Sequence, residues 1–182
     1  MQRSEAAHVG ALTLAAYDAH GLMQGGYRSY LGDPLQRIDG CTALLVAEVA
    51  GDIVGTVTLV RPGDEQWEGR PDADGDCGFR VLAVAPHAEG HGVGRRLAEA
   101  CLDRYRELGC RRVSIMSMEW MGRAHGLYRR LGFVRRPDLD VRFPSGQGVA
   151  FTCDLAPDAA EHFAPPGPPP ARPPWYEDAW RL

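Results

Sequence analysis

The segment 84–102, VAPHAEGHGVGRRLAEACL, constrains the fold of this chain more than any other. It follows an apolar stretch, CGFRVLAV (77–84), and passes through three alternate glycines into a stretch with apolar residues every three to four positions. The first stretch has the composition of a β-strand and ends at Pro86, whereas the second has the period of an α-helix and ends at Gly109. The sequence therefore predicts a strand, a glycine-rich turn and a helix in direct succession.

The glycine-rich turn has the chemistry of an anion site. Gly90, Gly92 and Gly94 remove every second side chain, so that a ligand can approach a row of backbone N–H donors. These donors open a helix, whose N-terminus carries partial positive charge, and Arg95 and Arg96 add charge of the same sign. The turn favours a phosphate or pyrophosphate, the alternative being a strand-to-helix connection without a ligand.

Spacing excludes two common nucleotide sites. A Walker loop requires Gly-Lys-Ser/Thr after its glycines, and none follows here. A dinucleotide fingerprint requires G-x-G-x-x-G and an acid about 20 residues further on, but Arg95 stands at the third glycine and the acid is out of place. The turn therefore either binds its anion by another pattern or is a connection without a ligand.

The remaining elements predict an α/β (α+β) fold with a mixed central sheet flanked by helices in one domain, residues 1–155. Proline lacks the backbone N–H and fixes φ, and seven of the 14 prolines fall in 164–182, within the tail 156–182, which we expect to be extended. Its Trp175, Tyr176 and Trp180 are expected to dock on this subunit or a neighbour. The elements expected are two short helices in 4–31, a hairpin in 42–60, an exposed loop at 61–76, a strand at 111–118, a helix around 124–131, and two strands near 133–142 and 148–155.

Composition limits the partners and the compartment. The chain is 45% hydrophobic, with Lys+Arg 20 against Asp+Glu 24 and a formal net charge of −4, which does not indicate a nucleic-acid partner. No apolar run is long enough to cross a bilayer, and the N-terminus lacks the features of a signal peptide. These features predict a soluble, cytoplasmic protein without a membrane partner.

The cysteines and histidines do not form a metal-binding pattern. The five cysteines include no C-x-x-C pair and fall mostly inside apolar strand or helix patterns, so we expect buried, reduced thiols rather than a disulfide framework. The six histidines show no H-E-x-x-H and no Cys/His spacing. The sequence therefore predicts no metal site.

Two motifs together resemble those of the GNAT superfamily of acyl-CoA-dependent N-acyltransferases. The first is V-x-P-x-x-x-G-x-G-x-G-x-x-L, starting at Val84, and the second is RAHGLYRRLGF at 123–133. They occur in the family's order and spacing, and the resemblance covers about residues 4–155. It implies a GNAT-like fold, acetyl-CoA as co-substrate, no metal, and acetyl transfer to a primary amine of a small-molecule or protein acceptor.

The resemblance also implies a set of cofactor-binding residues. The strand before the turn splays from its neighbour, and its backbone pairs with the pantetheine arm, whereas the turn amides hold the pyrophosphate. Two positions depart from the family: Glu89 replaces the usual Arg or Gln, and Met121 replaces an Asn that bonds the cofactor or its water. The residues implied are Leu82, Ala83 and Val84 for the strand, Gly90, His91, Gly92, Val93, Gly94 and Arg95 for the turn, and Met121.

The catalytic residues implied are an acid and a base. Tyr128 corresponds to the family's tyrosine, which protonates the departing thiolate; its alternative is a core residue, since it shares a helix face with Ala124 and Leu131. The usual glutamate on the strand before the turn is missing. Glu48 and Glu119 are the substitute bases, each alternatively a solvated strand residue. The backbone N–H of Val84 is expected to polarise the thioester carbonyl.

The acceptor site is expected between the N-terminal helices and the later strands, lined by Met23, Tyr27 and Tyr30. If the acid-rich loop 61–76 borders it, the loop would favour a cationic amine. The chain begins at a helix where relatives begin with a strand. This predicts either an upstream start or an open sheet edge that favours a homodimer.

Two other functions are compatible with the same residues. A catalytically silent acyl-CoA-binding sensor or scaffold would account for Glu89, Met121 and the missing base. An unrelated nucleotide-binding α/β protein would bind ADP-containing dinucleotides as well as CoA.

Overall fold

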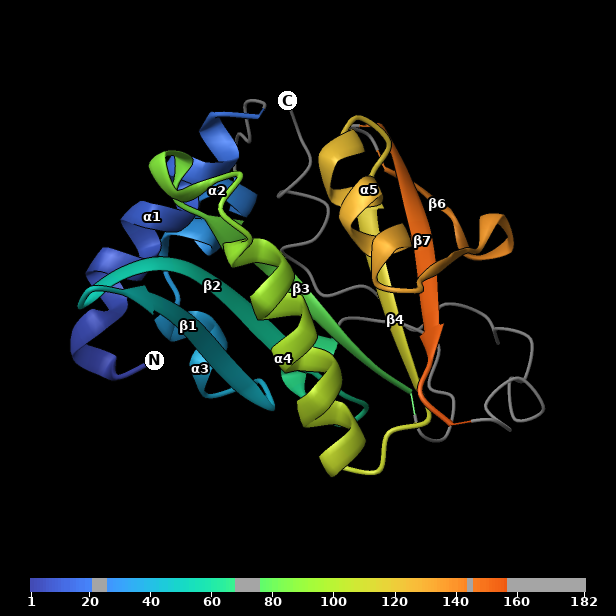
Figure 1. The fold of residues 1–182 in the computed structure, drawn as a ribbon. Helices are drawn as coiled ribbons and strands as arrows, with labels where there is room; N and C mark the ends of the chain where they lie inside the picture. The colour runs from blue at the N-terminus through green and yellow to red at the C-terminus, as the bar shows by residue number, and fades with distance from the viewer. Residues whose placement is uncertain (21–25, 68–75, 144–145, 157–182) are drawn as a thin grey trace.

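A computed structural model describes residues 1–20, 26–67, 76–143 and 146–156. Figure 1 shows a single sheet with helices packed against it. The helices are α1 (Ala6–Asp18), α2 (Gly26–Gly32), α3 (Leu35–Ile38), α4 (Val93–Glu107) and α5 (Gly122–Arg130). The strands are β1 (Ala43–Val49), β2 (Asp52–Val60), β3 (Asp76–Val84), β4 (Arg112–Met118), β5 (Val134–Arg135), β6 (Val141–Phe143) and β7 (Gly146–Asp154).

The sheet is mixed and is divided near its centre. Its strand order is β1-β2-β3-β4-β7-β5, with β6 also paired to β7. Every described pairing is antiparallel except that of β3 with β4, which is limited to Asp76 opposite Arg112 and Cys77 opposite Val113. Beyond these pairs the two strands diverge (Figure 1), and β3 keeps β2 as its only described strand neighbour.

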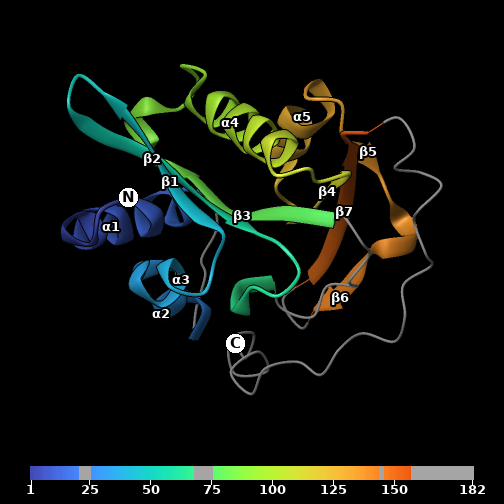
Figure 2. The same cartoon turned by 90° about the horizontal axis from the view of Figure 1, so that it is seen from below.

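Helices cover both faces of the sheet. Figure 2 shows α4 and α5 on one face and α1, α2 and α3 on the other. The amphipathic α4 buries Leu97, Cys101 and Tyr105, and the hydroxyl of Tyr105 accepts the backbone N–H of Val60 at 3.0 Å. Gly109, with φ +73°, follows this helix at the predicted position. The fold class expected from the sequence is confirmed.

Local sequence explains most element boundaries. The two-residue hairpin turn between β1 and β2 has φ +53° at Ala50 and +92° at Gly51, as a type I′ turn requires. The strand expected near 133–142 is instead divided into β5 and β6, because the 3₁₀ turn at Pro137–Leu139 interrupts it. The short helix α3 was not expected.

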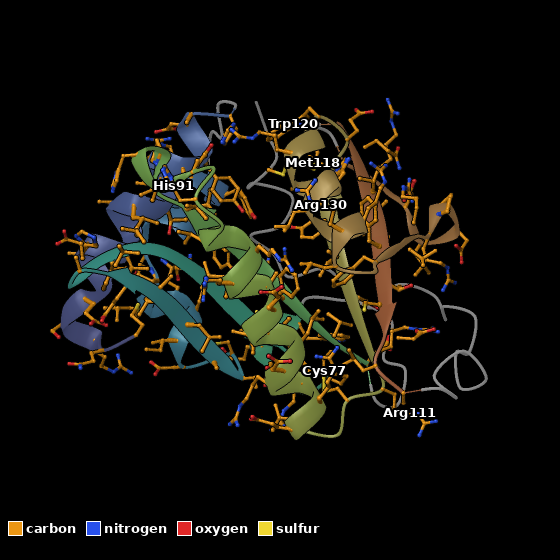
Figure 3. All side chains as sticks on the ribbon, in the orientation of Figure 1. Cys77, His91, Arg111, Met118, Trp120 and Arg130 are labelled. Atoms are coloured by element: carbon orange, nitrogen blue, oxygen red, sulfur yellow. A yellow bond between two sulfur atoms is a disulfide. The ribbon has the colours of Figure 1, made fainter. Side chains whose placement is uncertain are left out.

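One expectation about the cysteines is wrong. Cys77 and Cys110 form a disulfide with a Cα–Cα distance of 6.3 Å, whereas Cys41, Cys101 and Cys153 are free. The physical reason is tertiary: Cys77 pairs with Val113 where β3 and β4 still touch, and Cys110 lies just before β4. The disulfide therefore fastens the end of the sheet opposite the divergence, where Figure 3 labels Cys77.

Some expectations lie outside the described residues. These are the acceptor-site residue Met23, the aromatic residues Trp175, Tyr176 and Trp180, and part of the acid-rich loop. Within the described ranges, no helix is long and apolar enough to cross a membrane. The same ranges contain no group of three or more His, Cys, Asp or Glu side chains arranged to hold a metal ion.

Candidate active site

The divergence of β3 from β4 leaves one backbone edge of β3 without a strand partner among the described residues. The N–H of Ala85 donates to the carbonyl of Val54 in β2 at 2.9 Å. Because successive residues of a strand direct their backbone groups to opposite sides, Ala83 also faces β2, and Leu82 and Val84 face the open edge. Of the three strand residues expected to bind pantetheine, two thus present their backbone at this edge.

A bulge in β3 lies beside the open edge. Thr56 pairs with Ala83 and Thr58 with Arg80, so that two residues of β3, Val81 and Leu82, oppose Val57 alone. Val81 has φ +50°, a conformation that costs a β-branched residue about 1–3 kcal/mol. Bulges of this kind redirect a strand and are common next to active sites.

The predicted glycine turn presents consecutive backbone N–H groups, and residues 90–95 are called the cradle below. Gly90 and Gly92 have φ of +79° and +84°, and a Cβ at either position would meet no atom within 4 Å, so conformation rather than crowding requires glycine. The first bond of α4 is donated by Arg96 to the carbonyl of Gly92 at 3.0 Å. The backbone N–H groups of residues 90–95 have no hydrogen-bond partner in the described part of the chain. This row fits a pyrophosphate.

The side chains around the cradle are positioned away from it or packed beneath it. The Nε of Arg95 donates to Glu99 at 2.8 Å, one turn along α4, and the ring of His91 is exposed and bonds the carbonyl of Glu89. Val93 is buried. A Cβ on Gly94 would lie 3.5 Å from Val84, in ordinary contact, so crowding does not require glycine at this position. The cradle therefore consists of backbone.

Glu89 is held by two basic side chains. Its Oε1 lies 2.6 Å from Nε2 of His20, just after α1, and its Oε2 accepts Nη1 of Arg123 in α5 at 2.6 Å. The carboxylate therefore links the end of α1, the turn and the start of α5. The repulsion expected between this carboxylate and a pyrophosphate is offset by these neighbours.

Tyr128 of α5 is 7% exposed and lies in an aromatic cluster. Its ring centroid is 6.0 Å from that of Phe79, 5.8 Å from Phe133 and 5.9 Å from Phe151. Burial, followed by the nearby thiol of Cys101, raises the pKa of Tyr128 well above its usual value, so the phenol remains protonated at neutral pH. The phenol makes no hydrogen bond to a described residue. The position of Tyr128 is therefore compatible both with a purely structural role in the core and with a role as proton donor.

The start of α5 is fixed to the end of β4. Met121 precedes the helix, and its sulfur accepts the hydroxyl of Ser117 at 3.4 Å. The buried His125 donates from Nε2 to the carbonyl of Met118 at 3.0 Å, and burial lowers its pKa. Figure 3 shows Met118 and Trp120 across the divergence from His91. These contacts set the orientation of the helix that carries Tyr128.

The structure does not bring the two candidate bases together. Glu119 follows β4, and its Oε1 accepts the N–H of Gln147 at 3.1 Å, which joins it to the start of β7. Glu48 is exposed on the edge strand β1, opposite Ile53, with β2 and β3 between it and the open edge. Glu119 is therefore the nearer of the two to the divergence.

An aromatic cluster covers the bulged face of β3. Tyr27 and Tyr30 of α2 stack with ring centroids 5.6 Å apart, and Tyr30 packs with Leu31 against Val81. Tyr17 of α1 joins this cluster. Burial raises the pKa of Tyr17 well above its usual value, with added effects from the phenols of Tyr27 and Tyr128.

Two arginines missed from the sequence accompany the cluster. The guanidinium carbons of Arg37 and Arg80 each lie 5.1 Å from the ring centroid of Tyr30. The hydroxyl of Tyr30 donates to Gln66 at 2.7 Å. Arg37 follows Tyr30 by seven positions and carries no pattern of its own, so no sequence signal identified it.

A sheet divided between β3 and β4, with an N–H-lined glycine turn at the open end and helices on both faces, is the arrangement that the two sequence motifs led us to expect. A profile described as the acetyltransferase (GNAT) family matches residues 15–133 of the chain. The chain belongs to the GNAT acetyltransferase family. This match confirms the family and the class of enzyme expected from the two sequence motifs.

Individual relatives are similar over different extents. A mycothiol acetyltransferase from Cellulomonas flavigena is 38% identical over 101 residues, which are 54% of this chain but only 28% of that protein. Among solved structures, a GNAT acetyltransferase from Brucella melitensis in complex with acetyl-CoA has a TM-score of 0.65 at 20% identity, covering 92% of this chain and 90% of its own. The ribosomal-protein-S18-alanine N-acetyltransferase of Escherichia coli has a TM-score of 0.65 at 14% identity, covering 86% and 91%. At these identities the structural similarities establish the fold.

Proposed function

We propose that the protein is an N-acetyltransferase that transfers the acetyl group of acetyl-CoA to a primary amine of a small-molecule or protein acceptor. The observation that carries this proposal is the divergence of β3 from β4, with six consecutive unpartnered N–H groups, residues 90–95, at its open end. The Brucella melitensis relative, of the same fold, was solved with acetyl-CoA. Acetyl-CoA would supply an activated acetyl thioester.

Backbone groups are proposed to hold the cofactor. The open-edge N–H and C=O groups of Leu82 and Val84 are available to the amide groups of the pantetheine arm, and the amides of residues 90–95 to the pyrophosphate. Since Met121 offers a thioether instead of an amide, no side-chain donor replaces the family's Asn there. Because the cradle is backbone, its geometry depends on glycine conformation rather than on particular side chains.

Proton transfers are assigned to two side chains. A neutral acceptor amine attacks the thioester carbonyl, whose developing negative charge is stabilised by an open-edge N–H of β3, that of Val84 in our assignment. Tyr128 is a weak acid but stays protonated, so it donates a hydrogen bond and then a proton to the departing thiolate. Glu119, acting through water, is the proposed base, with Glu48 as the less favourable choice.

A catalytically silent acyl-CoA-binding module is the second candidate. Two sequence features favour it: Met121 stands where the family has Asn, and the family's glutamate is missing from the strand before the turn. Such a module would bind acetyl-CoA without releasing CoA in the presence of amines.

The experiment that separates these functions is a calorimetric titration with acetyl-CoA, followed by an assay of thiol release with a panel of primary amines. Binding with amine-dependent release of CoA supports the transferase. Binding without release supports the silent module. If acetyl-CoA does not bind, both proposals are wrong.

A further inference from the structure

Arg37 is a fully buried cation, and three of its five N–H donors have no partner among the described residues. Its exposed fraction is 0%, and its Nη1 donates to the carbonyls of Tyr30 and Leu31 at 2.5 and 3.4 Å. Its Nε and Nη2 are also buried, and they have no hydrogen-bond partner in the described part of the chain. Leaving donors of a charged group unsatisfied in the interior is costly, so such a group calls for a functional explanation.

Among the described residues, no carboxylate supplies a counter-charge to Arg37. No carboxylate of a described residue forms an ion pair with it, and the groups that favour its charged form are the phenols of Tyr30, Tyr27 and Tyr17. Burial lowers the pKa of Arg37, the nearby Arg80 adding to this effect, but an arginine remains cationic at neutral pH. The protein thus maintains a positive charge among aromatic rings.

This charge belongs to the region where the acceptor is expected. Arg37 lies 5.1 Å from the ring of Tyr30, which packs on the strained Val81 of the β3 bulge. Tyr17 packs both against this cluster and against the main hydrophobic core, of which Tyr128 is a member. The guanidinium and the proposed proton donor are thus connected through one set of tyrosines.

The unused donors have the geometry for a carboxylate. The N–H groups of Nε and Nη2 lie on one edge of the planar guanidinium and match the two oxygens of a carboxylate in a bidentate pair. The backbone carbonyls of α2 are bound by Nη1, on the other side of the group. Holding the end of α2 requires only Nη1, which a shorter donor could replace, so this structural role leaves the second edge unexplained.

We propose that the acceptor is an amine that also carries a carboxylate, and that Arg37 binds this carboxylate as a specificity-determining residue. The inference rests on the proposed acetyltransferase function. In the reaction the acceptor nitrogen bonds to the acetyl carbon as the carbon–sulfur bond breaks, one proton leaves the nitrogen and one is gained by the CoA thiolate, and the carboxylate is unchanged. This carboxylate-bearing acceptor differs from the cationic amine that the acid-rich loop led us to expect. Residues 68–75 of that loop lie outside the described structure.

A binding experiment tests the carboxylate site independently of catalysis. Glycine, β-alanine, γ-aminobutyrate and phenylalanine are each compared with their carboxamides by ligand-observed NMR on the full chain saturated with CoA. We expect the preferred carboxylate to bind at least about tenfold more tightly than its amide, the size of a charge-assisted pair. Absence of any preference for the carboxylate would overturn the proposal.

Variants connect the preference to Arg37. Arg37→Lys keeps the charge and a donor for the α2 carbonyls but removes the bidentate edge, so we expect the preference to fall to about threefold or less. Arg28→Lys, on the exposed side of α2 where Arg28 pairs with Asp18, is the matched control and should keep the preference. Acetyl-CoA affinity, unchanged in both variants, verifies folding. A preference that survives Arg37→Lys overturns the assignment.

Release of CoA separates this inference from the proposed function. Carboxylate binding that depends on Arg37 without CoA release would support the anion site and contradict the transferase. Equal CoA release with the acids and their amides would support the transferase and contradict the role of Arg37.

Discussion

At the residue scale, Tyr128 combines a packing role with a proposed chemical one, and a single oxygen atom separates them. Phenylalanine at this position keeps the ring contacts with Phe79, Phe133 and Phe151 but cannot donate a proton. We expect Tyr128→Phe to lower kcat by about 10²–10⁴-fold, the usual contribution of general acid catalysis, with unchanged affinity for acetyl-CoA. Steady-state kinetics and calorimetry measure the two quantities. An unchanged kcat would leave Tyr128 as a core residue.

The raised pKa of Tyr128 also predicts the pH dependence of the rate. The active form of an acid is the protonated one, and a pKa raised above its usual value of about 10 extends that form to higher pH. Between pH 6 and about 9.5 the rate should therefore rise as the acceptor amine loses its proton, and should not fall. A falling limb below pH 10 that disappears in Tyr128→Phe would contradict this assignment.

Glu89 tests whether a departure from the family pattern weakens cofactor binding. Glu89→Gln removes the negative charge near the cradle and frees Arg123 from its partner at 2.6 Å. We expect acetyl-CoA to bind more tightly, by up to about fivefold, because partly exposed ion pairs contribute up to about 1 kcal/mol. Arg123→Gln is the opposite change and should weaken binding. Calorimetry at low salt measures both, and weaker binding in Glu89→Gln would mean that its links to His20 and Arg123 organise the cradle.

At the element scale, the glycine turn combines conformation with binding. Alanine at Gly92, whose φ is +84°, should cost about 1–2 kcal/mol in the free energy of unfolding and weaken acetyl-CoA binding, because relaxing the strain moves the amides. Gly122→Ala, at the start of α5, is the control: it has open space around it and should be neutral. Chemical denaturation and calorimetry compare them. Equal affinities of the two variants for acetyl-CoA would exclude a role for the turn conformation in binding the cofactor.

The elements predicted from the sequence are those whose structure is determined by residues close together in the chain. Periodicity and glycine punctuation predicted α4, α5 and the β1–β2 hairpin, and the glycine pattern predicted the cradle. The bulge at Val81 and the burial of Arg37 have no local cause, because each depends on residues from other elements: Val57 of β2 for the bulge, and the end of α2 for the arginine. The acceptor side of the site was therefore only partly predictable.

At the scale of the whole molecule, the two halves of the sheet are joined at one end and separated at the other. Sequence spacing suggested the separation only through the family resemblance. The disulfide between Cys77 and Cys110 could not be predicted, since their separation of 33 residues contains all of α4, and only the pairing of β3 with β4 brings them together. The crosslink lies at the joined end, so it restrains the β3–α4–β4 unit without covering the open edge.

This arrangement predicts that the disulfide affects stability more than binding. Closing a loop of 33 residues lowers the entropy of the unfolded chain by an amount worth roughly 3–4 kcal/mol. Dithiothreitol should therefore lower the free energy of unfolding of the wild-type protein by up to this amount and have no effect on a Cys77→Ala/Cys110→Ala double variant. Cys41→Ala, which removes a free thiol, is the control and should remain sensitive to reductant.

Chemical denaturation with and without reductant measures this difference, and thiol titration of the unreduced, denatured protein should find the three thiols of Cys41, Cys101 and Cys153. Five titrated thiols would show that the bond is absent in solution. Affinity for acetyl-CoA should change little on reduction, because Leu82, Val84 and the cradle lie at the opposite end of β3 from Cys77. A large loss of affinity would instead mean that the joined end of the sheet holds the open end in its binding geometry.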